Sequence, residues 1–354
     1  MRILLTGGAG FIGANLALYL REVCPTATIV CMDSLHRRGS ELNRPRLLAH
    51  GIDFHRGDVR DPSAFPDGPF DSLIECSAEP SVLAGHDDRL DFLFHTNLVG
   101  AFNCLEQARR WNCGVLFLST SRVYPIERLE SHPWSEGDTR FSWKDNGLPG
   151  ISSRGVRECL EMGGARSLYG YTKYAAELLI EEYRSRWHVK AVVNRCGAIA
   201  GPWQFGTVDQ GIVSLWVLAH HFGWPLTYIG HGGSGKQVRD LLHVDDLCRL
   251  IAEQVQDLDT WDGWTGNVAG GVDNSASLLE LTALCRDATG RDTPISGEPV
   301  TRPDDVRIFI GDCTRLFERT AWRPRRPVRQ LVADVANWVR EQEAPLADLM
   351  RARP

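Results

Sequence analysis

The sequence has few lysines, no long hydrophobic run and no block of basic residues. Its 39 Lys and Arg residues include only four lysines, which are Lys144, Lys173, Lys190 and Lys236. The formal net charge is −6, and without a basic patch the chain has no electrostatic footprint for nucleic acid or an anionic membrane. No stretch approaches the roughly 18 consecutive apolar residues that a spanning helix needs. We therefore expect neither a polynucleotide nor a membrane as a partner.

The ten cysteines are scattered singly, with no C-x-x-C pair and no Cys/His run at zinc spacing. This distribution is typical of buried free thiols in a reducing compartment. The histidines, including His220 and His221, have no partner at ligand spacing. The apolar run at residues 3–6 is too short for a signal sequence. We expect a cytoplasmic protein without a bound metal.

Short apolar runs alternate with helix-period segments along the first 200 residues. Strand-like runs occur at 3–6, 28–32, 53–55, 72–76, 115–119 and 190–195, and helical stretches occur at 11–23, 97–110 and 171–186. This alternation predicts an α/β fold with a parallel, doubly wound sheet, whose ligands bind at the carboxyl ends of the strands. The regular alternation of strand-like and helical segments ends after Arg195, which indicates a smaller second lobe. The length allows about two domains, which we expect at 1–200 with 237–265 and at 201–236 with 266–354.

A glycine-rich turn, Gly7-Gly8-Ala9-Gly10-Phe11-Ile12-Gly13, joins the first expected strand to the first expected helix. Glycines permit a tight turn and let a pyrophosphate approach the backbone N–H groups at the helix N-terminus. Asp33 follows Gly13 by 20 residues, which matches the spacing of about 20 for a carboxylate that binds a ribose. This pattern favours NAD over NADP, although Arg37 and Arg38 are placed to receive a 2′-phosphate. The alternative is a glycine turn without a ligand.

Tyr169 and Lys173 form a Tyr-x-x-x-Lys pair at the start of an expected helix. Positions i and i+4 share one face of a helix, so the phenol and the ammonium can act on one substrate. A tyrosine with an ordinary pKa of about 10 is a poor base at neutral pH, and a nearby ammonium and a positive nicotinamide ring are expected to lower that pKa. The alternative interpretation is a surface tyrosine beside a solvated lysine.

Together these residues resemble the extended short-chain dehydrogenase/reductase family, which contains nucleotide-sugar epimerases and dehydratases. Further matching segments are 57–61, 76–78, Asn97, 119–124, 237–246 and 322–324. The resemblance implies a Rossmann doubly wound parallel sheet with a smaller C-terminal α/β substrate lobe. It also implies that Thr120, Tyr169 and Lys173 are catalytic. The residues implied to contact a tightly bound NAD are Gly7, Gly10, Phe11, Ile12, Gly13, Asp33, Ser34, Arg37, Asp58, Val59, Ser77, Ala78, Asn97, Tyr169, Lys173 and Cys196.

Departures from the family pattern narrow the expected reaction. Dehydratases resemble Thr-Asp-Glu-Val-Tyr at the segment where this chain has Thr120, Ser121 and Arg122. Elimination of water needs an acid and a base beside the hydroxyl, so we expect no dehydration. Glu79 stands where small or amide residues are usual, which places an unexpected carboxylate near the substrate.

Residues 204–211, 230–240 and 301–307 are similar to the CDP-tyvelose (CDP-paratose) 2-epimerase group. This similarity implies an NAD-dependent epimerase of a nucleotide-diphosphate sugar, acting at C2 of a CDP-hexose through a transient keto-sugar. Another NDP-sugar, a 4-epimerase and an NAD(P)H-dependent sugar reductase stay open as alternatives. The implied substrate contacts are Glu79, Gln204, Gln210, Tyr228, Arg239 and Arg302, of which the two arginines clamp the diphosphate. We expect a homodimer or a homotetramer.

Overall fold

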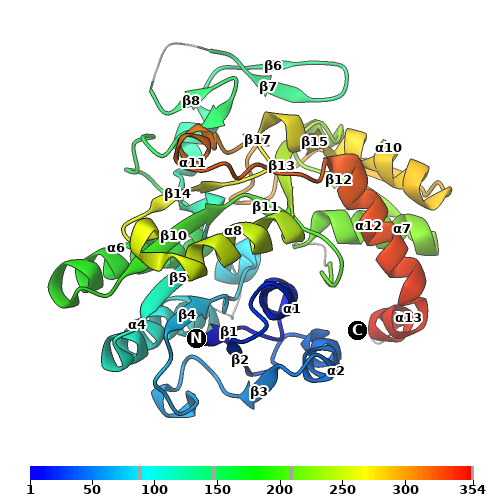
Figure 1. Cartoon of the computed structure of the whole chain (residues 1–354). Coiled ribbons are helices and arrows are strands. Elements are labelled where there is room, and N and C mark those ends of the chain that lie inside the picture. Colours follow the sequence, from blue (N-terminus) through cyan, green and yellow to red (C-terminus); the bar gives the residue numbers. More distant parts are fainter. Residues whose placement is uncertain (87–89, 146–148, 207–209, 352–354) are drawn as a thin grey trace. The chain divides into compact units, whose positions relative to one another are not determined.

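The computed structural model describes residues 1–86, 90–145, 149–206 and 210–351, and contacts divide the chain into two units (Figure 1). The first unit comprises Met1–Val123, Arg166–Cys196 and Leu247–Gly266. The second unit comprises Tyr124–Ala165, Gly197–Asp246 and Asn267–Pro354.

The first unit is built on a seven-stranded sheet with the order β14-β10-β5-β4-β1-β2-β3 (Figure 1). Its strands are β1 (Arg2–Thr6), β2 (Thr28–Asp33), β3 (Asp53–Arg56), β4 (Ser72–Glu75), β5 (Gly114–Thr120), β10 (Ala191–Cys196) and β14 (Thr265–Val268), the last of which ends in the second unit. The pairings from β3 through β10 are all parallel. The predicted parallel, doubly wound sheet is confirmed. Strand order reverses between β1 and β4, and ligands bind at such a switch point.

Helices cover this sheet because parallel strands are apolar on both faces. They are α1 (Phe11–Val23), α2 (Asn43–Ala49), α3 (Leu90–Phe94), α4 (Gly100–Trp111), α6 (Leu168–Trp187), α8 (Val244–Gln256) and α9 (Leu258–Trp261). One buried cluster joins α4 and α6 to the strands through residues such as Leu4, Leu105, Phe117 and Ile180. The expected helix at 97–110 is divided, because the π-helical turn η4 (His95–Val99) precedes α4.

The second unit contains several small sheets. Strand β13 (Val238–His243) pairs in parallel with β11 (Ala198–Ala200) and β17 (Ile308–Phe309), and antiparallel with β15 (Ser275–Ser277). Three further pairs join β12 (Leu226–Ile229) to β16 (Ile295–Glu298), β6 (Trp134–Glu136) to β7 (Phe141–Trp143), and β8 (Ile151–Ser152) to β9 (Gly155–Val156). The helices that lie wholly in the second unit are α5 (Ile126–Glu130), α7 (Ile212–Phe222), α10 (Leu278–Thr289), α11 (Thr314–Arg319), α12 (Val328–Glu341) and α13 (Glu343–Arg351).

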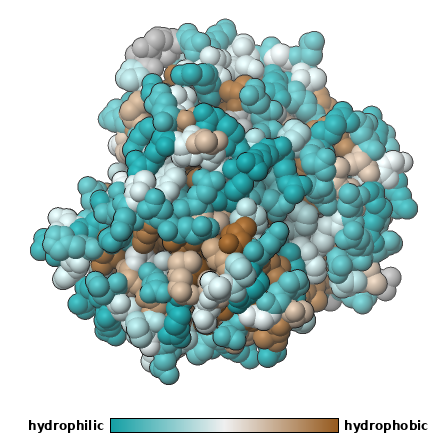
Figure 2. All heavy atoms as spheres, viewed as in Figure 1, coloured by the Kyte–Doolittle hydropathy of each residue, from teal (hydrophilic) through white to brown (hydrophobic). Residues whose placement is uncertain are grey.

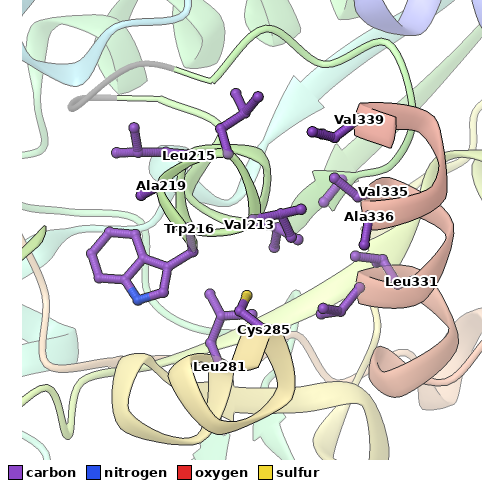
Figure 3. Packing of buried hydrophobic residues seen from close by; sticks show 14 of the residues in the cluster. Val213, Leu215, Trp216, Ala219, Leu281, Cys285, Leu331, Val335, Ala336 and Val339 are labelled. Atoms are coloured by element: carbon purple, nitrogen blue, oxygen red, sulfur yellow. The ribbon is translucent and has the colours of Figure 1, made fainter. Parts of the chain in front are cut away.

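Helices α7, α10 and α12 form the hydrophobic core of the second unit. Figure 3 shows side chains from the three helices pointing toward one another, among them Trp216, Leu281 and Leu331. The Trp216 indole donates a hydrogen bond to the Thr282 hydroxyl at 3.0 Å, so its polar atom is satisfied inside this core. The apolar segment around Trp216 is consistent with either a core or a subunit interface, and the structure places this side chain in the core.

The segment Tyr124–Ala165 belongs to the second unit, whereas we expected it in the first domain. The Tyr124 hydroxyl donates to Asn267 Oδ1 at 2.7 Å, and Glu130 pairs with Arg307 at 2.9 Å. These contacts join residues more than 140 positions apart. No periodicity in a sequence predicts such distant partners, which is why the sequence placed this segment in the first domain. The expected domain boundaries stay a proposal.

Among the residues that the structure describes, no helix is long and apolar enough to cross a membrane. Within the same residues, no group of three or more His, Cys, Asp or Glu side chains is arranged to hold a metal ion. Figure 2 shows a largely hydrophilic face with hydrophobic residues gathered over parts of the first unit. Exposed apolar side chains of that unit include Phe102 on α4 and Leu178 on α6.

Candidate active site

The glycine turn between β1 and α1 lies at the switch point of the sheet. A Cβ on Gly7 would lie 2.8 Å from the backbone of Cys76, and one on Gly13 would lie 2.2 Å from the Gly7 carbonyl oxygen. Gly7 also has a positive φ of 63°. Larger residues are therefore excluded by close packing as well as by conformation. Gly10 is the N-cap of α1 and makes no side-chain cap, so the first N–H groups of this helix are left for a ligand.

Asp33 ends β2 beside this turn. Its carboxylate accepts hydrogen bonds from the Ala9 N–H at 3.0 Å and the Leu35 N–H at 2.7 Å. Burial raises the pKa of Asp33, and the backbone hydrogen bonds oppose that rise. The predicted ribose carboxylate is thus held against the glycine turn. The uncapped helix, the glycine cradle and this carboxylate fit a dinucleotide.

The other predicted cofactor residues near β2 and β3 lie on loops, where Arg37 is exposed, Ser34 and Asp58 are half-buried and Val59 is buried. Ser34 Oγ accepts the His36 N–H at 3.4 Å, and the Arg37 side chain is exposed. Asp58 follows β3 and forms a 2.7 Å ion pair with Arg60, which lowers the pKa of Asp58. The Val59 carbonyl accepts a hydrogen bond from Asn103 at 2.8 Å, which ties this loop to α4.

Asn97 organises the loop after β4. Its side chain donates to the Glu79 carbonyl at 3.0 Å and the Thr172 hydroxyl at 3.2 Å, and it accepts from the Glu79 N–H at 2.8 Å. The buried amide therefore joins the loop that carries Ser77 and Ala78 to α6. The Glu79 carboxylate accepts the Ser81 N–H at 3.0 Å, so this carboxylate helps to shape its own loop.

Thr120, Tyr169 and Lys173 come together at the carboxyl end of β5. Ser167 caps α6 by accepting the Gly170 N–H at 3.1 Å. A Cβ on Gly170 would lie 2.1 Å from the Arg122 carbonyl oxygen, so glycine lets α6 approach the turn that follows β5. The Thr120 hydroxyl hydrogen bonds with the Tyr169 phenol. The structure thus brings the three predicted catalytic side chains into one site.

The pKa of Tyr169 is set by opposing effects of burial and of its polar neighbours. Lys173 lowers it, as do the Thr120 hydrogen bond and Arg122, but burial is the largest effect and leaves this pKa above its ordinary value of 10.0. The expected lowering by the ammonium is therefore present, but burial outweighs it in the chain alone, and the joint effect of Lys173 and the nicotinamide ring stays a prediction. Burial was not predictable from the spacing of Tyr169 and Lys173 because it depends on β5 and β10.

Lys173 has a partner that the sequence did not indicate. Its Nζ lies 3.5 Å from Glu75 Oε2 and 4.3 Å from the centre of the Phe117 ring. Both Lys173 and Glu75 are almost completely buried. The signal that was available is a carboxylate at the end of the apolar run 72–76, since a charge buried in a parallel sheet needs a partner.

Cys196 and the pair Glu177–Arg195 complete the surroundings of α6. The Cys196 thiol is buried and donates to the Asn194 carbonyl at 3.5 Å. Glu177 forms a buried 2.7 Å ion pair with Arg195. This second pair anchors α6 to β10 one turn beyond Lys173.

The second unit places the predicted phosphate arginines beside one turn. Arg239 donates to Asp305 Oδ1 at 2.6 Å and to the Val306 carbonyl at 2.7 Å. The Arg302 carbonyl accepts the Asp305 N–H at 3.3 Å. Arg239 and the backbone of Arg302 are thus linked through Asp305, which holds the Arg239 guanidinium in a fixed orientation.

Of the three remaining predicted substrate residues in the second unit, Gln204 and Tyr228 have hydrogen-bond partners there. Gln204 donates to the Ile199 carbonyl at 3.0 Å and accepts from the Ser214 hydroxyl at 3.3 Å. Tyr228 shares a 2.8 Å hydrogen bond with Thr282, and its ring packs against the core. Gln210 directly precedes the glycine that caps α7. A substrate contact for these three side chains stays a prediction.

Comparison with known proteins identifies the family. The model of the NAD dependent epimerase/dehydratase family matches residues 3–263. The chain belongs to this family. It is therefore an enzyme of the epimerase/dehydratase class that uses NAD, and the resemblance seen in the sequence is confirmed.

Individual proteins of known activity match nearly the whole chain. CDP-paratose 2-epimerase from Salmonella typhi is 29% identical, over 96% of this chain and 99% of its own. dTDP-glucose 4,6-dehydratase from Mycolicibacterium smegmatis is also 29% identical, over 100% of this chain and 98% of its own. The structure of UDP-glucose 4-epimerase from Thermotoga maritima with UDP-glucose superposes with a TM-score of 0.75 at 22% identity. The superposition covers 97% of this chain and 100% of that one. This last likeness shows the shared fold.

Proposed function

We propose that the protein is an NAD-dependent epimerase that inverts C2 of a CDP-hexose. The observation that carries the proposal is the grouping of Thr120, Tyr169 and Lys173 in a chain whose glycine turn fits a dinucleotide. The likeness to CDP-paratose 2-epimerase supports the nucleotide and the carbon. The residues after Thr120 support epimerisation over dehydration, because Ser121 and Arg122 do not supply the acid and base that elimination needs.

The side chains of the first unit suit a reversible proton transfer. When bound, NAD supplies an acceptor and donor for the hydride of the sugar carbon. Tyr169 takes the proton of the sugar hydroxyl at its phenolic oxygen and later returns it. Thr120 holds the reacting oxygen by a hydrogen bond, and the Lys173 ammonium stabilises the phenolate. Because the hydride returns to the opposite face, no net oxidation follows, and NAD stays bound through turnover.

For the second unit we propose that Arg239 and Arg302 bind the diphosphate of the substrate. A guanidinium held in a fixed orientation recognises phosphate oxygens with two parallel hydrogen bonds. Asp305 supports this role because it orients Arg239. Glu79, Gln204, Gln210 and Tyr228 complete the proposed set of substrate contacts.

Isotope labelling tests the proposed reaction. The purified protein is incubated with CDP-hexoses that carry deuterium at C2, beside the UDP-, GDP- and dTDP-hexoses. We expect inversion at C2 with the label retained, because the hydride does not exchange with water. Loss of the label to solvent indicates proton abstraction and would refute the proposal. Net consumption of added dinucleotide would identify a reductase, and inversion at C4 would identify a 4-epimerase.

Oligomeric state and location are also proposals. We propose a homo-oligomer, a dimer or a tetramer, that associates through exposed apolar side chains on neighbouring elements of the first unit, which are Val99, Phe102, Tyr171 and Leu178. Light scattering of the protein and its Phe102→Glu variant tests this, and an unchanged mass would contradict it. A cytoplasmic location is supported by ten cysteines that are all free.

A further inference from the structure

Glu75 is a buried carboxylate for which the proposed reaction has no use. It ends β4, its side chain is 1% exposed, and its Oε1 atom has no hydrogen-bond partner among the described residues. Burying an ionised carboxylate costs much free energy, so burial raises the pKa of Glu75, and Lys173 opposes that rise. A core position in a parallel sheet would be occupied more stably by an apolar residue. The position of Glu75 is therefore explained by what it contacts.

What Glu75 contacts is the proposed catalytic lysine. Its Oε2 lies 3.5 Å from Lys173 Nζ, and Glu75 is the carboxylate within ion-pair distance of Lys173 in the part of the chain that the structure describes. A buried ammonium needs a counter-ion, because burying an uncompensated charge costs much free energy. The position of the Lys173 ammonium, and with it the effect of Lys173 on Tyr169, therefore depends on Glu75.

The other groups near Lys173 and Tyr169 do not supply that anion. Cys76 on the loop after β4 and Cys104 on α4 are thiols whose pKa is raised by burial, so they are neutral. Phe117 on β5 offers only its ring face. The groups facing Tyr169 from other elements are the Thr120 hydroxyl, the Cys196 thiol and Arg122. None of these groups is a carboxylate.

We propose that Glu75 is a positioning residue that holds the Lys173 ammonium in place through a buried ion pair, so that Lys173 is able to act on Tyr169. The inference rests on the proposed function for the roles of Tyr169 and Lys173. It assigns to Glu75 an effect that is exerted through Lys173 and not by contact with substrate or NAD.

A titration of Tyr169 tests this inference without any substrate. The tyrosinate absorbance of each protein is measured against that of the same protein with Tyr169→Phe. The difference between the two reports the ionisation of Tyr169 alone. The NAD-bound wild type, Glu75→Gln and Glu177→Gln are each compared with their Tyr169→Phe counterpart over a range of pH. Glu177→Gln is the matched control, because it removes a buried carboxylate from a pair on the same helix and leaves the Glu75–Lys173 pair intact.

We expect Glu75→Gln to move the midpoint of Tyr169 upward by about one pH unit or more, because Lys173 is no longer held where its ammonium acts on Tyr169. Glu177→Gln should leave the midpoint unchanged. Glu75→Asp keeps the negative charge and should restore a midpoint near that of the wild type, and this variant decides the question if Glu75→Gln does not fold. An unchanged or lower midpoint in Glu75→Gln, or a large upward shift in Glu75→Asp, would overturn the inference.

A double-mutant cycle separates an effect through Lys173 from a direct one. In a Lys173→Met background, Glu75→Gln should have no further effect on the midpoint of Tyr169. A shift of the same size in that background means that Glu75 acts on Tyr169 directly, and the inference fails. Removing both partners of a buried ion pair is less destabilising than removing one, so the double variant is expected to fold.

The catalytic readout distinguishes this inference from the proposed function. If the protein is an epimerase, Glu75→Gln should lower kcat at neutral pH about tenfold for every pH unit by which the Tyr169 midpoint rises. KM should stay unchanged, and kcat should recover at higher pH. If no nucleotide sugar is epimerised, the proposed function fails. The absorbance titration still decides the role of Glu75 in that case, because it needs no turnover.

Discussion

The predicted catalytic residues of the first unit and the predicted substrate residues of the second unit differ in what holds them. Tyr169 has Thr120 and Lys173 as neighbours, and both were themselves predicted to be catalytic. In the second unit, Arg239 is held by Asp305, which had no predicted role. Thr120 ends β5, and Tyr169 and Lys173 share one face of α6, so local geometry predicts that these three side chains come together. A motif in a loop predicts only which residue is present.

The largest expected effect concerns the first of these two groups. Tyr169→Phe should lower kcat by about 100-fold to 10,000-fold, because it removes the proposed acid and base while it keeps the ring packing. NAD should stay bound, as mass spectrometry of the denatured protein will show. Tyr171→Phe, on the same helix but half exposed, is the control and should be fully active. A fully active Tyr169→Phe would refute the role of the phenol.

The hydrophobic core of the second unit gives the next largest effect. Leu331 is fully buried between α12 and its neighbours, so Leu331→Ala should lower the free energy of unfolding by about 2–5 kcal/mol. Urea-induced unfolding measures this loss. Leu48→Ala, at an exposed position on α2, is the control and should change stability little. Equal losses in the two variants would show that the core is not where the structure places it.

Asp240 on β13 should make stability depend on pH. Burial raises its pKa from 3.8 to about 6, against hydrogen bonds from the Gly311 and Ala198 N–H groups. The folded chain therefore binds a proton more tightly than the unfolded chain. The stabilisation is complete below about pH 4 and is lost as the pH rises through about 6, by about 3 kcal/mol at most.

Unfolding of the wild type and of Asp240→Asn at several pH values isolates this contribution. The difference between the two proteins should change between about pH 4 and pH 6 and stay constant above that range. Asp287→Asn, at an exposed position, is the control. A difference that is constant from about pH 4 upward would mean that Asp240 titrates normally.

The smallest effect is expected for the phosphate arginine of the second unit. Arg239→Met should raise KM for the nucleotide sugar about tenfold with little change in kcat, because the contact binds the ground state and the transition state equally. Arg329→Met, whose charge is exposed on α12, is the control. If KM is unchanged, the ion pair of Arg239 and Asp305 stabilises the fold and does not bind substrate. The two units would then differ further, because only the first would hold confirmed functional residues where the sequence predicted them.

Much of the first unit was predictable because its signals are local. The glycine turn, Asp33 at the end of β2 and the Tyr169–Lys173 pair all depend on spacing within one strand, turn or helix. The helix expected at 171–186 is the later part of α6, which begins at Leu168 because Ser167 caps it. Repeating apolar periodicity also predicted the parallel sheet.

The sequence by itself determined the class of fold and the family, and it indicated the side chains that are proposed to react, because short-range geometry dictates strands, turns and helix faces. Only the tertiary structure decided which charges meet: Glu75 with Lys173, 98 positions apart, and Arg239 with Asp305, 66 positions apart. It also decided that burial outweighs Lys173 in setting the pKa of Tyr169. Charge pairing and burial depend on contacts between distant segments, and no local pattern contains them.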